Sequence, residues 1–224
     1  MIFFSYNFPH RKTQDFLLYC AINNININMI IAQERVQLNH EKIPFKFKNE
    51  VKPIFHPKEL ADFFNIDYKV LDHNSQESED LLNTLRPELG LITGARILKK
   101  EIINKFKIGI INFHPGDIPI IRGLYSPLKA IKLNHKQILT SHLINEKIDA
   151  GKILIKKEIE IQQSITISEI YEKLYQAQFE IISTSIKKAL KSEFQIINNF
   201  DKYDNSIPYS SHEAFLKDLK KYNP

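Results

Sequence analysis

The chain has 224 residues, 43% of them hydrophobic and 25% charged, which is typical of a globular protein and excludes disordered and collagen-like classes. The net charge of +5 is spread without a polybasic block, so it permits an anionic small-molecule partner, and we expect no nucleic-acid partner. The single cysteine, Cys20, excludes a disulfide scaffold. Because no apolar run reaches the length of a signal peptide or a membrane span, we expect a cytoplasmic protein without a membrane partner.

In chain order, apolar runs alternate with segments of helical period through the first half of the chain. The helix expected at 75–85 opens with Ser75 and Ser78 and has acidic residues in its first turn, which are the usual features of a helix start. The expected elements are a strand at 2–6, a helix at 12–20, a strand at 25–31, an irregular stretch with prolines at 34–57, a helix at 58–64, a strand at 67–71 and the helix at 75–85.

The second half continues the alternation and ends in a polar, aromatic segment. We expect strands at 89–93, 109–113, 137–144 and 152–161, and helices at 98–106, 124–133 and 164–190. This order predicts an α/β, Rossmann-like, mostly parallel sheet with helices on both faces. Residues 1–190 are assigned to one domain, and residues 191–224 to a C-terminal extension with a strand, a loop and a short helix at 212–222.

The glycines are unevenly distributed, since all six lie from residue 90 to residue 151. The first 89 residues therefore contain neither a glycine-rich dinucleotide fingerprint nor a Walker loop, which excludes the usual NAD-binding and P-loop classes. Glycine allows other groups to approach the backbone closely. The window that holds every glycine is therefore where we expect a functional site.

Polar residues cluster at the carboxyl end of the strand expected at 109–113, where open α/β sheets place their ligands. Asn112 and His114 are two residues apart, so on a strand both side chains project to the same face. Two prolines and a glycine then make a tight, stiff loop. Asp149 lies in a turn that follows another expected strand.

An amide, an imidazole and a carboxylate are the groups that acyl transfer to an amine requires. The amide N–H can hydrogen-bond the oxyanion of a tetrahedral intermediate. The imidazole, with an ordinary pKa of ~6.5, can accept the amine proton at neutral pH, and the carboxylate can orient it or raise its basicity. The alternative is a hydrogen-bonded pair at a strand end with a turn-forming aspartate, but the joint spacing favours a site.

The motif N-x-H-P-G-x-x-P-x-x-R-G at 112–123, followed by I-D-A-G at 148–151, resembles the 10-formyltetrahydrofolate-dependent formyltransferase family. The specific part of this resemblance covers residues 88–160. It implies the Rossmann-like fold of that family, N-formyltransferase activity and 10-formyltetrahydrofolate as the formyl donor. Within the family, the chain is most similar to bacterial sugar N-formyltransferases of the dTDP-4-amino-4,6-dideoxyglucose formyltransferase type.

By this resemblance, Asn112, His114 and Asp149 are the catalytic residues, and residues 1–190 form the catalytic domain. One departure is Lys129, where many members of the family carry a tryptophan. His142, on a strand expected beside the site, could serve either core packing or support of the site.

The resemblance also assigns the folate-binding segment. It consists of Gly94, Ala95, Arg96, Ile97 and Leu98, which are similar to the segment whose backbone receives the pterin. A pterin presents an amide-like edge of donors and acceptors, and peptide groups suit such an edge.

Cations near the expected ligand cleft are candidates for binding the formyl acceptor. Arg11 and Lys12 follow the first strand at a helix start, a place that suits a phosphate, although a solvated helix start explains them equally well. Arg122 and Gly123 lie in the loop next to the catalytic histidine. We predict that the acceptor is a nucleotide-linked amino sugar, a dTDP-4-amino-4,6-dideoxyhexose, used for bacterial surface polysaccharide such as lipopolysaccharide O-antigen.

Other acceptors remain open. A methionyl-tRNA formyltransferase normally carries a further barrel domain, and a glycinamide ribonucleotide formyltransferase has a glycine- and serine-rich loop after its first strand, where this chain has no glycine. A formyltetrahydrofolate hydrolase and a folate- or nucleotide-binding module without catalysis are further alternatives. The histidines show no metal-ligand spacing, so we assign no metal, and a homodimer is left open.

Overall fold

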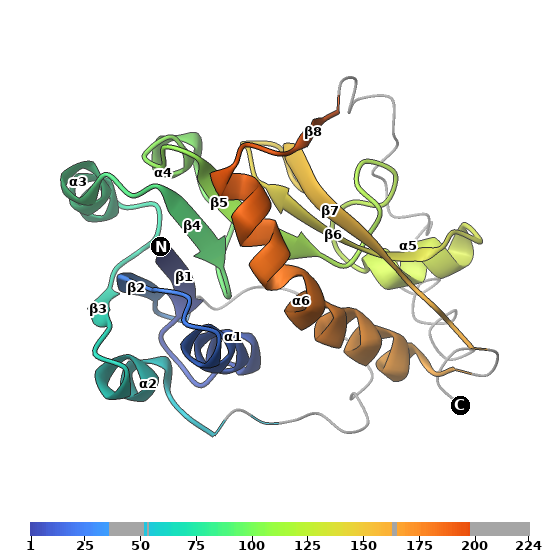
Figure 1. The fold of residues 1–224 in the computed structure, drawn as a ribbon, viewed down its shortest axis with the longest axis horizontal. Coiled ribbons are helices and arrows are strands. Elements are labelled where there is room, and N and C mark those ends of the chain that lie inside the picture. The colour runs from blue at the N-terminus through green and yellow to red at the C-terminus, as the bar shows by residue number, and fades with distance from the viewer. Residues whose placement is uncertain (36–51, 53, 163–164, 198–224) are drawn as a thin grey trace.

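The computed structural model describes residues 1–35, 52, 54–162 and 165–197, and these form one eight-stranded sheet covered by helices (Figure 1). In chain order the elements are β1 (Ile2–Tyr6), α1 (Arg11–Ile22), β2 (Met29–Gln33), α2 (Pro57–Phe63), β3 (Asp67–Val70), α3 (Gln76–Leu85), β4 (Leu89–Ile92), α4 (Lys100–Ile103), β5 (Gly109–His114), α5 (Ser126–Lys132), β6 (Gln137–Leu143), β7 (Lys152–Ile159), α6 (Ile167–Leu190) and β8 (Gln195–Ile196).

The strand order is β3-β2-β1-β4-β5-β6-β7-β8. The five strands from β3 to β5 are parallel, whereas β6, β7 and β8 each run antiparallel to the strand before them. This confirms the predicted α/β fold with a mostly parallel sheet. The order reverses between β1 and β4, and ligands of open α/β sheets bind at the carboxyl ends of the strands beside such a reversal.

Alternate side chains of each strand enter two separate core layers, one on each face of the sheet. On β5, Ile111 and Phe113 pack into the layer that includes residues of α1, α2, α5 and α6, and Figure 1 shows α6 crossing the sheet. Ile110 packs into the other layer, with residues of α3 and α4. Helices therefore cover both faces, as predicted, and Asn112 and His114 continue the α3/α4 face of β5.

Side-chain caps define several helix starts. The Ser75 hydroxyl accepts a hydrogen bond from the N–H of Ser78 at 3.2 Å, which confirms the start predicted for α3. α6 begins after Thr166, whose hydroxyl accepts the N–H of Glu169 while the Glu169 carboxylate accepts the N–H of Thr166. This reciprocal pair satisfies two N–H groups that the first turn leaves without partners.

The strand predicted at 25–31 begins only at Met29. The residues before it complete the end of α1, because the N–H of Ile25 donates to the Cys20 carbonyl and Asn24 has a φ of 54°. Ile25 still packs against the core, but from a helix-ending turn instead of a strand. The apolar alternation that suggested a strand at this point therefore reflects packing of a turn.

The helix predicted at 98–106 is reduced to the four residues of α4. The N–H groups of Lys105 and Phe106 donate to carbonyls three residues earlier, so the chain turns more tightly and brings the Phe106 ring into the core. None of the described helices is long and apolar enough to cross a membrane.

Two of the predicted segments lie largely outside the described residues. Most of the irregular stretch at 34–57 does so, as does the helix expected at 212–222. Of the predicted C-terminal extension, the strand is present as β8.

The connection from β6 to β7 folds back over the sheet. β6 pairs Thr140 with His114 and Leu143 with Ile111, so it ends away from the carboxyl end of β5. The chain then reverses at Gly151, which has a φ of 108° and would place a Cβ 2.1 Å from the carbonyl oxygen of Leu143. Only glycine fits this position, and the reversal returns the preceding residues toward His114.

We expect Gly151→Ala to lower the free energy of unfolding by about 2 kcal/mol or more, because it adds both left-handed strain and a clash with a carbonyl. Urea unfolding followed by circular dichroism measures this change. Glu146→Ala, at an exposed position of the same connection, is the matched control and should change the stability by less than ~0.5 kcal/mol. Equal stabilities of the two variants would contradict this role of Gly151.

Candidate active site

Asn112 and His114 lie at the carboxyl end of β5, on the same face of the strand, as their spacing predicts. His114 is 4% exposed, whereas Asn112 is partly exposed. The imidazole is therefore buried, whereas the neighbouring amide is accessible to solvent in part.

His114 has a protein partner at each ring nitrogen. Nδ1 lies 3.3 Å from Oδ2 of Asp149, and Nε2 lies 3.0 Å from the carbonyl oxygen of Ile121 and 3.1 Å from Oγ of Ser126. The Ser126 hydroxyl also lies 2.8 Å from the carbonyl oxygen of Gly123. When Nδ1–H donates to Asp149, this hydroxyl can turn and donate to Nε2. When Nε2–H donates to Ile121, it can donate to Gly123 instead, so Ser126 accommodates both tautomers.

The electrostatic surroundings keep His114 neutral. Burial lowers its pKa, and the Lys129 and Arg122 cations act in the same direction. The Asp149 carboxylate and the Ile121 carbonyl oppose this by raising the pKa, without overcoming the effect of burial. The imidazole is therefore in the unprotonated state that a proton acceptor requires at neutral pH.

Asp149 reaches this site from the connection that Gly151 turns back. Its Oδ2 accepts a hydrogen bond from the N–H of Gly123 at 2.7 Å, and its side chain is 16% exposed. The neighbouring Ile148 carbonyl accepts a hydrogen bond from Nη1 of Arg122 at 3.3 Å. Two bonds thus join the loop after β5 to the connection and hold the carboxylate beside the imidazole.

His142 orients the Asn112 amide from the neighbouring strand, where the two residues are directly opposed. His142 Nδ1 lies 2.9 Å from the carbonyl oxygen of Ala150, which can only accept, so Nδ1 carries the proton. Nε2 then accepts an N–H of Asn112 Nδ2 at 3.3 Å. Burial lowers the pKa of His142 to about 4 and keeps this arrangement neutral. Among the described residues, no hydrogen bond uses the second N–H of this amide.

Two further polar side chains hold the loop after β5. Thr140 Oγ1 donates to the carbonyl oxygen of Gly116 at 2.6 Å. The Asp117 carboxylate is held between Nε2 of His135, at 2.8 Å, and Nζ of Lys156, at 2.5 Å. The loop that carries the partners of the imidazole is thereby tied to β6 and β7.

The predicted folate segment follows β4. The N–H groups of Thr93 and Gly94 both donate to the Phe4 carbonyl at 3.0 Å, and the Tyr6 hydroxyl donates to the Ala95 carbonyl at 3.1 Å. A Cβ on Gly94 would lie 2.7 Å from the Tyr6 ring, so glycine is needed here for packing against that ring.

The remaining peptide groups of this segment suit the predicted pterin. Among the described residues, no hydrogen bond uses the N–H groups of Ala95, Arg96 or Ile97, and the last two residues are exposed. Leu98 is 3% exposed and anchors the segment in the core. A row of open backbone donors thus lies on a fixed support, which fits a ligand with an amide-like edge.

The two cations predicted for the acceptor have different surroundings. The Arg11 guanidinium forms two hydrogen bonds of 2.7 Å to Glu172, an ion pair that joins α1 to α6. The ammonium of Lys12 lies 5.3 Å from the ring centre of Phe16 and 5.8 Å from that of Phe113, and no carboxylate of the described residues pairs with it. Lys12 is therefore the better placed of the two for an anion.

The predicted substrate residues after β5 belong to the support of Asp149. Arg122 is 6% exposed, and Gly123 has a φ of 78°. The Arg122 side chain donates to the Ile148 carbonyl, and the Gly123 N–H donates to the Asp149 carboxylate. Their role in substrate binding stays a prediction.

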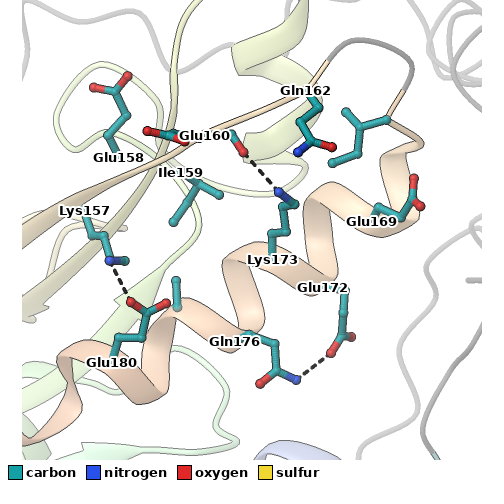
Figure 2. Close-up of a pocket in the computed structure, with 12 residues that line it drawn as sticks. Lys157, Glu158, Ile159, Glu160, Gln162, Glu169, Glu172, Lys173, Gln176 and Glu180 are labelled. Carbon is teal, nitrogen blue, oxygen red and sulfur yellow. Dashed lines mark hydrogen bonds and ion pairs between the residues drawn. The ribbon is translucent and has the colours of Figure 1, made fainter.

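A groove of about 690 Å³ lies between β7 and α6 (Figure 2). It is lined largely by charged side chains, including the ion pair of Lys157 and Glu180 at 2.9 Å. None of the predicted catalytic residues lines it. The groove is therefore not part of the candidate site.

Sequence reasoning missed Ser126, Thr140 and Asp117. The available signal was the run of three polar residues, Thr140, Ser141 and His142, within a strand that is almost entirely buried. Within the described residues, no group of three or more His, Cys, Asp or Glu side chains could hold a metal ion.

The sequence matches known proteins over most of its length. A family model described as formyl transferase matches residues 21–186. The methionyl-tRNA formyltransferase of Borrelia recurrentis (strain A1) is 30% identical over 123 residues, which cover 54% of this chain and 40% of that protein. The chain therefore spans less than half of the length of this relative.

Solved structures share the fold at lower identity. A phosphoribosylglycinamide formyltransferase from Bacillus halodurans has a TM-score of 0.63 and 17% identity, covering 85% of this chain and 95% of its own. A sugar N-formyltransferase from a Shewanella species has the same TM-score of 0.63 and 19% identity, covering 92% of this chain and 75% of its own. These likenesses confirm the predicted fold and do not discriminate between acceptors.

We expect Asp149→Asn to lower the pKa of His114 further, because it removes the negative charge that opposes the effect of burial. A titration of the histidine resonances by NMR measures this pKa, and in an activity profile the acidic limb should move to lower pH. Glu146→Gln, exposed in the same connection, is the control and should leave the titration unchanged. An unaltered His114 titration in Asp149→Asn would mean that Asp149 serves only the turn.

Proposed function

The chain belongs to the formyl transferase family, and from this membership we propose that it transfers a formyl group from 10-formyltetrahydrofolate to the amine of a nucleotide-linked amino sugar. The observation that carries the proposal is the meeting of Asn112, His114 and Asp149 at the carboxyl end of β5. These are the amide, imidazole and carboxylate that formyl transfer to an amine needs.

Each group has a separate task in this proposal. The N–H of Asn112 that His142 leaves available donates to the formyl oxygen as negative charge develops on it. His114, neutral and paired with Asp149, takes up the proton that the attacking amine releases, and the carboxylate stabilises the imidazolium that results. When the tetrahedral intermediate collapses, the bond from the formyl carbon to N10 of the folate breaks, and N10 takes the proton that His114 holds, which releases tetrahydrofolate. The open peptide donors of residues 95–97 would hold the pterin.

A diphosphate in the acceptor is supported by Lys12. Burial lowers the pKa of its ammonium to about 8, and the ammonium lies at the start of α1 near the rings of Phe16 and Phe113, on the face of β5 opposite to Asn112 and His114. A cation with no carboxylate partner among the described residues is available for a phosphate. A glycinamide ribonucleotide and a methionyl-tRNA, the acceptors named by other similar proteins, also carry phosphates, so the acceptor itself must be tested.

The acceptor is tested by offering the purified protein, with 10-formyltetrahydrofolate, three amines in parallel: dTDP-4-amino-4,6-dideoxyglucose, glycinamide ribonucleotide and methionyl-tRNA. Mass spectrometry of the products detects the added formyl group. We expect kcat/KM for the nucleotide sugar to exceed the others by about a hundredfold or more, since a site built for one set of polar groups rejects others strongly. A preference for either of the other two would overturn the sugar as acceptor.

We expect Lys12→Met to raise the KM for the nucleotide sugar about tenfold with little change in kcat, because a charge-assisted contact to phosphate is lost in the ground and transition states alike. In the unaltered protein the KM should also rise as the pH increases through about 8, where the Lys12 ammonium loses its proton. Lys187→Met, an exposed change on α6, is the control and should keep both the KM and its pH dependence. A Lys12→Met variant with unaltered KM would place the phosphate elsewhere.

A further inference from the structure

We propose that Lys129 is a positioning residue for the Asp149–His114 pair and acts on it through the single peptide group that joins Arg122 to Gly123. The proposal rests on the proposed function only in taking that pair as the catalytic one. Lys129 lies on α5, and its link to the site runs through main-chain atoms.

One peptide group carries both of the hydrogen bonds involved. The carbonyl oxygen of Arg122 accepts from Nζ of Lys129 at 2.6 Å, and the N–H of Gly123 donates to Oδ2 of Asp149 at 2.7 Å. The C=O and N–H of a trans peptide point in opposite directions, so the ammonium and the carboxylate lie at opposite ends of the same unit. The ammonium at the carbonyl oxygen and the carboxylate at the N–H both polarise the peptide in the same direction. Each hydrogen bond therefore strengthens the other.

The peptide needs such a support. Gly123 has a φ of 78° and no side chain, so its backbone is less restricted than that of other residues. The Lys129 side chain is 5% exposed, and a buried ammonium is costly unless acceptors surround it. A Cβ on Gly123 would lie 3.5 Å from Nζ, an ordinary contact distance, so the ammonium lies close beneath the loop. The carbonyl of Arg122 therefore gives the ammonium an acceptor while the ammonium fixes the orientation of the peptide.

The titratable and charged groups that face His114 come from four parts of the chain. Asp149 in the connection raises the pKa of His114, while Lys129 on α5 and Arg122 in the loop lower it. His142 on β6 is kept neutral by burial. Loss of the ammonium should remove a repulsion and also leave the carboxylate without its fixed N–H donor. Both changes raise the pKa of His114, so the direction of the effect is determined.

The first test compares Lys129→Met with Lys132→Met, an exposed change on the same helix, by NMR. We expect the pKa of His114 to rise by about half a unit or more in Lys129→Met, and the Gly123 amide resonance to move as its hydrogen bond weakens. The Lys132 variant should show neither change. A Lys129→Met protein with an unaltered His114 titration and Gly123 resonance overturns the proposal, whatever its activity.

The second test separates positioning from packing by activity. Lys129→Met should lower kcat about tenfold, with the acidic limb of the pH profile at higher pH, and Lys129→Arg should restore most of both because it returns a charged donor. If the Met variant does not fold, Lys129→Gln replaces it, since it retains an N–H donor and removes only the charge. Equal losses in Lys129→Arg and Lys129→Met would mean that the residue only fills space.

A double-substitution cycle examines the route through Asp149. If Lys129 acts through the peptide, Lys129→Met should lower kcat much less in the Asp149→Asn background, where the carboxylate has already been neutralised. Independent, additive losses would overturn that route. Because the NMR measurements need no acceptor, a failure of the proposed function would leave the first test standing, and the two failures are distinguishable.

Discussion

The contact between the His114 imidazole and the Asp149 carboxylate is the constraint on which the rest of this structure depends. The two residues are 35 positions apart in the sequence, and the connection that carries Asp149 starts beside the amino-terminal half of β5, whereas His114 lies at its carboxyl end. β5 delivers the imidazole directly at its carboxyl end. The carboxylate arrives only because the β6–β7 connection reverses over the sheet, and that reversal demands a glycine at 151.

The buried polar groups around this contact hydrogen-bond to one another and to nearby backbone carbonyls. Each ring nitrogen of His114 and His142 faces a donor or an acceptor. Buried polar atoms are costly without partners, so a network of this kind holds its members in few arrangements. The arrangement determines which amide hydrogen of Asn112 is free, and the chemistry proposed for the site depends on that hydrogen.

The sequence predicted those features that depend on local periodicity. Alternation of apolar residues identified the strands, and the two-residue spacing of Asn112 and His114 placed both on one face, because strand geometry makes this unavoidable. The start predicted for the strand at 25–31 was wrong, because the N–H of Ile25 donates to the Cys20 carbonyl at the end of α1 and the strand begins only at Met29. A turn that buries apolar residues has the same pattern as a short strand, and only the hydrogen bonds distinguish them.

The sequence by itself determined the fold class, the order of the elements and the family to which the chain belongs, since these follow from patterns within short windows and from a motif of fixed spacing. Only the tertiary structure decided which charged side chains form ion pairs with one another. Arg11, which the sequence placed on a par with Lys12, pairs with Glu172 from a helix 161 residues away. No local pattern contains that partner, because α1 and α6 meet only where they pack together on one face of the sheet.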